Sequence, residues 1–347
     1  MSQNSSLNKL SARDYWYDNA KAVLIVLVVV GHLATTDISP ERDWVDGFAK
    51  FIYFFHMPVF MVISGRFSKG RIDRKDYGKA ITHLLIPYLF LQTGMLLLRS
   101  AVNANTSDFS YLSPLFGLWY LFALFLYSVI TPKLSRLRFL MPIALVVAVG
   151  VAFLPSSLFG AFHRTVTFYP FFLFGYYTSS YTFSFCRKKW FRCLSAIFLI
   201  ALLCFTVRFT SNLRMDLFTL NVAIRDISGN KFWVTAEYFC HYAAAFICFF
   251  AFMGIMPGKK TFFSYMGVYS LYIYALHLFV VLFIRKVLVP IPLSDNVWVV
   301  LYLLSGVVLA FLLSSRPVRW LTRPFIEPKV NFHRIVETLP MDPPENK

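Results

Sequence analysis

Residues 20–36 read AKAVLIVLVVVGHLATT, an apolar run that is long enough to cross a bilayer as a helix. Similar runs recur along the whole chain. Of the 347 residues, 58% are hydrophobic and only 15% are charged, whereas soluble domains have about 25% charged residues. This composition excludes a soluble globular enzyme, a disordered chain and a coiled coil, and it indicates a polytopic membrane protein.

The lengths of the apolar runs predict ten membrane-spanning helices, at about 20–36, 48–66, 80–98, 114–131, 139–155, 166–183, 190–208, 233–254, 262–285 and 296–315. No strict alternation of apolar and polar residues runs through these segments, which favours helices over a β-barrel. The predicted fold class is an all-α polytopic membrane protein. Its parts are an N-terminal segment (1–19), a transmembrane domain (20–315) and a C-terminal tail (316–347).

The formal net charge is +17, from 34 Lys and Arg against 17 Asp and Glu. In a membrane protein, an excess of basic residues normally sets the orientation, so nucleic acid is not an expected partner. With ten spans, 23 basic residues fall on the side that holds both termini, and 9, Arg164 among them, fall on the other side. Both termini are therefore expected in the cytoplasm.

Four histidines lie at a similar depth within the predicted helices: His32, His56, His241 and His277. A rise of 1.5 Å per residue places each of them about 12 Å below the outer surface. Glu237 lies one turn from His241, which is close enough to pair with it or orient it. A lone histidine between helices contributes only about 0.6 kcal/mol as a hydrogen-bonding group, but four at one level beside a carboxylate indicate a site.

An imidazole at this depth can act as a general base on a hydroxyl group, because its pKa is near neutral. Metal binding is the alternative role, but no two of the four share a helix with ligand spacing, so no metal is expected. Lys21 precedes His32 by three helical turns, so the two lie on one face, about 16 Å apart. This arrangement suits a long donor with a phosphate head, such as a coenzyme A thioester.

Six short motifs carry a resemblance to a known family. They are RDYWYDNAKAVLIVLVVVGH (13–32), FFHMPVFMVISG (54–65), HLLIPYL (83–89), LWYLFALF (118–125), FYPFFLFGYY (168–177) and SLYIYALH (270–277). In this order they resemble motifs of the membrane-bound acyltransferase family 3, especially its fucose 4-O-acetylase-like branch. The spacing Lys21-x10-His32 is similar to the Arg/Lys-x10-His motif of that family. The resemblance covers residues 13 to about 280.

The resemblance implies ten helices and an O-acyltransferase that moves an acyl group, usually acetyl, from cytoplasmic acetyl-CoA to a sugar hydroxyl on the outer side. It implies that His32 is the essential catalytic residue. His56 is expected to orient the acceptor or share the proton, and Glu237, His241 and His277 are expected to support the site. Acetyl-CoA is the expected donor substrate.

The family often has Arg-x-x-Arg at the cytoplasmic end of the third helix, for the phosphates of coenzyme A. The equivalent stretch here, KAITHLLIP (79–87), offers Lys79 and His83 instead. Arg71 and Arg74 have the family spacing but lie in the preceding loop, and Arg66 follows the Ser64-Gly65 turn. The candidates for binding the donor are Lys21, Lys79, His83, Arg66, Arg71 and Arg74.

A transporter or flippase for a glycan intermediate or an organic anion is the alternative function, because a polar layer inside a helix bundle also suits a permeation path. Transporters more often show inverted repeats and broken helices, and the sequence shows neither. The expected partners are acyl-CoA, a glycan or lipid-linked sugar, the lipid bilayer and, as an open alternative, polysaccharide-assembly proteins. The expected location is a bacterial inner membrane or plasma membrane.

Overall fold

The computed structural model describes residues 13–34, 43–103, 110–155, 162–179, 182–220, 222–287 and 295–328, and these residues contain helices and no strand. The helices are α1 (Tyr15–Ala34), α2 (Asp43–Asp73), α3 (Tyr77–Ala80), η1 (Ile81–Leu85), α4 (Ile86–Asn103), η2 (Phe116–Leu118), α5 (Trp119–Leu134), α6 (Leu140–Ala152), α7 (Phe162–Tyr177), η4 (Ser184–Arg187), α8 (Lys189–Arg208), η5 (Thr210–Asn212), α9 (Met215–Thr219), η6 (Ile224–Asp226), α10 (Lys231–Ile255), α11 (Ser264–Val268), α12 (Ser270–Val287), α13 (Asp295–Leu313) and α14 (Arg316–Ile326).

The all-α polytopic class is confirmed, and each of the ten predicted ranges overlaps at least one helix in the described residues. In the described part of the chain, six helices are long and apolar enough to cross a membrane. The number rises to seven when Leu303–Leu313 and α14, which are bent by 70°, are counted as one span. Ten crossings and cytoplasmic termini therefore stay predictions.

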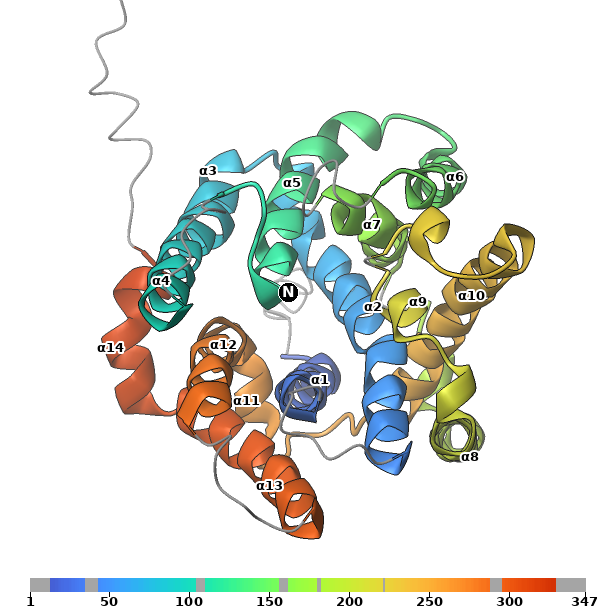
Figure 1. The fold of residues 1–347 in the computed structure, drawn as a ribbon. Coiled ribbons are helices and arrows are strands. Elements are labelled where there is room, and N and C mark those ends of the chain that lie inside the picture. Colours follow the sequence, from blue (N-terminus) through green and yellow to red (C-terminus); the bar gives the residue numbers. More distant parts are fainter. Residues whose placement is uncertain are drawn as a thin grey trace, which may run out of the picture.

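The first helix lies inside the bundle, where it contacts α2, α11, α12 and α13 (Figure 1). Its buried residues include three small ones, Ala20, Ala22 and Gly31. Small residues allow neighbouring helices to approach closely, which is the main source of helix association in a membrane. In the same view, α6 and α8 lie at the rim of the bundle.

Two glycines bring α2 and α7 into backbone contact. A Cβ atom built on Gly175 would lie 1.9 Å from the carbonyl oxygen of Val62, and one on Gly65 would lie 2.0 Å from that of Phe172. No side chain fits in either place. Gly65 and Gly175 belong to two of the sequence motifs, so packing accounts for both glycines.

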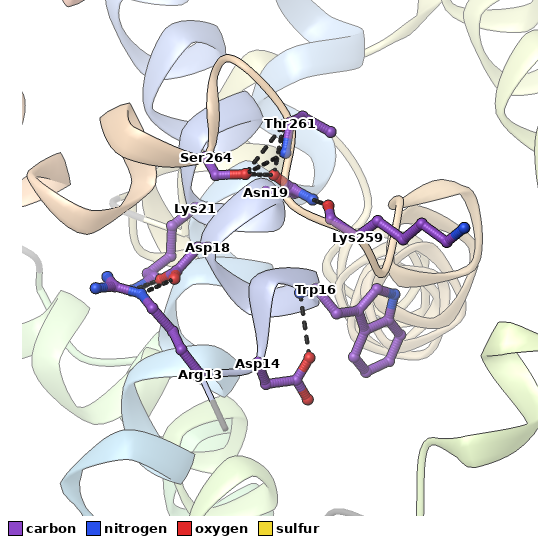
Figure 2. Close-up of polar contacts among 9 residues, drawn as sticks. All are labelled: Arg13, Asp14, Trp16, Asp18, Asn19, Lys21, Lys259, Thr261 and Ser264. Atoms are coloured by element: carbon purple, nitrogen blue, oxygen red, sulfur yellow. Dashed lines mark hydrogen bonds and ion pairs between the residues drawn. The ribbon is translucent and has the colours of Figure 1, made fainter. Parts of the chain in front are cut away.

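Polar side chains at the start of α1 attach it to the segment between α10 and α11 (Figure 2). The buried Asn19 amide donates hydrogen bonds to the carbonyl oxygens of Pro257 and Lys259, and its oxygen accepts from the hydroxyls of Thr261 and Ser264. All the hydrogen-bonding capacity of this amide is used. The contacts fix the height of α1, and therefore the position of the residues that follow along it.

The segment that was expected to be a tail begins with a further helix, α14. It carries Arg316, Arg319 and Arg323 on one arc, while Trp320 and Leu321 are exposed. In Figure 1, α14 lies at the edge of the bundle beside α4 and α12. Residues 329–347 lie outside the described part of the chain.

Candidate active site

A cavity of 320 Å³ lies between α1, α2, η2, α5, α7, α9 and α12, and we call it the histidine cavity. The residues that line it are Val28, His32, Tyr53, His56, Met57, Phe116, Gly117, Trp119, Arg164, Phe168, Met215, Phe218, Thr219 and Tyr274. The Tyr274 hydroxyl donates a hydrogen bond to the carbonyl oxygen of Gly117 and so joins α12 to η2. Both predicted catalytic residues therefore face one cavity.

Tyr53 lies between the two catalytic candidates. Its hydroxyl is 3.5 Å from Nδ1 of His32, and its ring centroid is 5.0 Å from that of His56. His32 and Gly117 both line the cavity, and Gly117 brings no side chain to Nε2 of His32, from which a Cβ atom built on it would lie 3.8 Å. A hydroxyl group of a substrate can therefore approach Nε2.

Backbone carbonyls fix the tautomers of two of the histidines. Nδ1 of His56 lies 2.8 Å from the carbonyl oxygen of Ile52, and Nδ1 of His277 lies 2.8 Å from that of Tyr274. A carbonyl oxygen only accepts, so Nδ1 donates in both rings and Nε2 keeps its lone pair in the neutral form. The ring centroid of His277 lies 5.3 Å from that of His32, so the structure brings together three of the four histidines.

His241 does not join this group, and its expected pairing with Glu237 is wrong. The imidazole packs against the rings of Phe54 and Phe218, at centroid distances of 5.0 and 5.5 Å. Both of its nitrogens are buried and have no hydrogen-bond partner in the described part of the chain. Glu237 is exposed on the outer surface of α10. The two residues are one turn apart, but a carboxylate avoids the desolvation of the interior and turns outward.

A second cavity, of 150 Å³, lies at the Lys21 end of α1, and we call it the inner cavity. Val28, Met57 and Tyr274 line both cavities, so the two meet at these side chains. Lys21 lines the inner cavity, and its ammonium lies 3.0 Å from the Asp18 carboxylate and 5.1 Å from the Phe67 ring centroid. The predicted donor residue and the predicted base thus line two neighbouring cavities along α1.

The other donor candidates lie around the same end of the bundle, outside the lining of the inner cavity. Lys79 is exposed and forms an ion pair of 3.0 Å with Asp76, and His83 and Arg74 are also exposed. The pKa of the Asp76 carboxyl lies below its usual range because the Lys79 backbone N–H and side chain both donate to it. The Lys79 ammonium is therefore already paired with a carboxylate of its own helical turn.

Arg66 and Arg71 already have internal contacts. The Arg66 guanidinium donates to the carbonyl oxygen of Thr178, and that of Arg71 donates to the hydroxyls of Ser68 and Ser128.

The stretch that contains His83 forms a π-helical turn, η1, which ends two residues before Pro87. Pro87 has no N–H to give to the His83 carbonyl, which explains why the helical hydrogen bonding shifts there.

Two residues of the histidine cavity escaped the sequence analysis. Tyr53 stands one turn before His56 in an aromatic stretch, with nothing in the sequence to single it out. Arg164 was assigned to an outer loop because helix 166–183 was expected, but α7 begins at Phe162, so Arg164 lies inside the helix and lines the cavity. In the described ranges, no group of three or more His, Cys, Asp or Glu side chains has a metal-binding arrangement.

A helical bundle with several helices long and apolar enough to span a membrane, and with His32 in an internal cavity, defines a polytopic membrane protein. The acyltransferase domain family matches residues 14–315, which is most of the chain. The protein belongs to this acyltransferase family.

Nodulation protein NolL of Mesorhizobium japonicum is 36% identical over 159 residues, covering 42% of this chain and 43% of that protein. Nodulation protein NolL of Sinorhizobium fredii is 35% identical over 179 residues, covering 47% of this chain and 48% of that protein. The chain thus spans about half the length of the curated relatives it matches. No solved structure matches the chain significantly.

Proposed function

We propose that the protein transfers an acyl group, most simply acetyl, from acyl-CoA to a hydroxyl group of a glycan. One observation carries this proposal: the inner cavity and the histidine cavity meet at Val28, Met57 and Tyr274, with Lys21 at one end and His32 at the other. Eleven residues of helix separate Lys21 from His32 by about 16 Å. We infer that the anionic head of the donor lies at Lys21 and that its long arm extends past these three side chains to His32.

In this mechanism His32 is the general base. Nε2 of His32 takes the proton of the acceptor hydroxyl, while the hydroxyl oxygen attacks the acyl carbon. A carbon–oxygen bond forms, the carbon–sulfur bond of the thioester breaks, and the proton passes from His32 to the departing thiolate. The Tyr53 hydroxyl, at 3.5 Å from Nδ1, orients the imidazole for this transfer.

His56 and His277 have supporting roles. In the neutral ring, Nε2 of His56 accepts a hydrogen bond, because Nδ1 is engaged by Ile52. We infer that Nε2 of His56 accepts a hydrogen bond from the acceptor sugar and so orients it at the cavity wall. His277 packs beside His32 and limits the motion of its ring. Lys21 attracts the phosphates of the donor, and the exposed Arg74 adds to the positive field at this end.

Acetyl-CoA and a sugar acceptor are the substrates that this proposal implies, as the resemblance of the motifs also does. The orientation proposed from the basic residues places the Lys21 end in the cytoplasm, where acyl-CoA is made. Two bacterial relatives support a bacterial inner membrane as the location. A glycan or lipid-linked sugar then receives the acyl group on the outer side.

The test is the His32→Ala variant, with radiolabelled acetyl-CoA and a glycan extract supplied to membranes that contain equal amounts of protein. The transfer of label should fall by about 10²–10⁴-fold, because the base is lost. His241→Leu is the matched control, since His241 is buried outside the cavity and should retain activity. Normal transfer by a folded His32→Ala variant would refute the assignment of the base.

A further inference from the structure

Arg164 is the cation of the histidine cavity. It is the third residue of α7, and it lines the cavity together with His32, His56 and Tyr53. Its Cζ atom lies 5.2 Å from the ring centroid of Trp119. None of the catalytic steps described above uses this charge.

No carboxylate neutralises Arg164 among the residues that the structure describes. Its Nε is buried and lacks a hydrogen-bond partner there. Lys50, which is more fully buried than Arg164, has internal partners: its ammonium lies 2.6 Å from the Asp46 carboxylate and donates to the Thr210 carbonyl oxygen. Arg164 is half-buried at the cavity, and a charged side chain inside a bundle of membrane-type helices usually has a functional partner.

The chemistry of the guanidinium points to the partner. Its planar fork matches the oxygens of a carboxylate or a phosphate, and it binds them more specifically than an ammonium does. The Trp119 ring holds the guanidinium from one side by a cation–π contact. The site therefore combines a general base with an anion-binding group.

We propose that Arg164 binds an anionic group, carboxylate or phosphate, of the sugar that accepts the acyl group. This inference rests on the proposed function and narrows its substrate to acidic glycans. The competing role is stabilisation of the oxyanion that forms during transfer. An anionic group of the acceptor engages the guanidinium as soon as the acceptor binds, whereas an oxyanion exists only during the reaction, so a binding measurement without donor separates the two roles.

The experiment measures binding and transfer separately, with the purified full-length chain in lipid nanodiscs. The probes are methyl glucuronide, methyl glucoside and methyl glucoside 6-phosphate, so the arms distinguish a carboxylate from a phosphate. Binding is measured by saturation-transfer NMR without donor. The wild type should bind one of the two anionic probes at least tenfold more tightly than methyl glucoside.

Arg164→Gln should remove this preference and leave the affinity for methyl glucoside unchanged, and Arg164→Lys should restore part of it. Arg208→Gln is the matched control, because the Arg208 guanidinium also stacks on a ring, that of Phe209, but lies exposed outside the cavity. A thermal melt of each variant identifies any loss of folding, and Arg164→Lys keeps the test valid if Arg164→Gln does not fold.

Three outcomes would overturn the proposal: equal binding of all probes by the wild type, an unchanged preference in Arg164→Gln, or an equal loss of transfer to charged and neutral acceptors with unchanged binding. The last outcome would assign Arg164 to the oxyanion. Failure of the proposed function looks different, because the wild type would then bind the anionic probe through Arg164 but transfer no acetyl group to any sugar.

Discussion

Gly117 controls the space in front of the catalytic base. It belongs to η2, and a Cβ atom added to it would contact Leu278 at 3.5 Å and Nε2 of His32 at 3.8 Å. Both distances are ordinary van der Waals contacts, so a methyl group fits without strain. The acceptor oxygen, however, must come within about 2.6–3.2 Å of Nε2 to lose its proton. The extra methyl group would compete for that space.

We therefore expect Gly117→Ala to fold normally and to lose acyl transfer by at least tenfold, with a higher apparent KM for the acceptor. Initial rates at several acceptor concentrations, together with a thermal melt, measure both effects. Gly150→Ala is the control, because no atom lies within 4 Å of the added Cβ. It should keep its activity and gain about 0.5–1 kcal/mol from the helix preference of alanine. Wild-type kinetics in Gly117→Ala would place the acceptor elsewhere.

At the scale of elements, the contact between α2 and α7 holds two walls of the histidine cavity, since α2 carries Tyr53 and His56 and α7 carries Arg164. Gly65 and Gly175 make the backbone contact possible. Any side chain at either position pushes the helices apart, because its Cβ would meet a carbonyl group of the facing helix. Stability and cavity geometry therefore depend on the same two residues.

Gly175→Ala should lower the stability by about 1–3 kcal/mol or more, the usual effect of overpacking. The measurement is the melting temperature and the yield of monodisperse protein on size exclusion. Gly258→Ala serves as the control, since nothing lies within 4 Å of its added Cβ. If Gly175→Ala melted like the wild type, the close approach of α2 and α7 would be wrong.

The helices were predictable because long apolar runs have few alternative structures in a membrane protein. The convergence of His32 and His56 was also predictable, because depth follows from residue count along each helix. Arg164 was missed because a boundary estimate four residues too late placed it in a loop. The predicted pairing of Glu237 with His241 is wrong. Sequence spacing shows that the two residues are one helical turn apart, but it does not show that the imidazole is buried while the charged carboxylate stays on the surface.

At the scale of the whole molecule, the 23 and 9 basic residues on the two predicted sides imply that both termini face the cytoplasm. A reporter that is active only in the cytoplasm should therefore be active when fused after Lys347. It should be inactive when inserted at Ser228, between α9 and α10. Activity at both positions would contradict the three crossings expected between Ser228 and Lys347, because an odd number of crossings places the two residues on opposite sides of the membrane.

The proposed path from Lys21 to His32 also involves the bundle as a whole. Val28 is the residue at which this path is best tested. Val28 is buried on α1 and lines both cavities, about one turn below His32. A larger side chain there fills the space where the cavities meet. We expect Val28→Trp to reduce acyl transfer by at least tenfold, because the acyl group no longer reaches the base.

Binding of coenzyme A at the Lys21 end should persist in Val28→Trp, so calorimetry with coenzyme A separates a blocked path from a lost donor site. Val146→Trp is the matched control, because Val146 is exposed on α6, at the rim of the bundle. Val28→Ala should retain transfer, since it widens the path. Wild-type transfer by a folded Val28→Trp variant would mean that the acyl group reaches His32 by another route, because a filled junction cannot pass it.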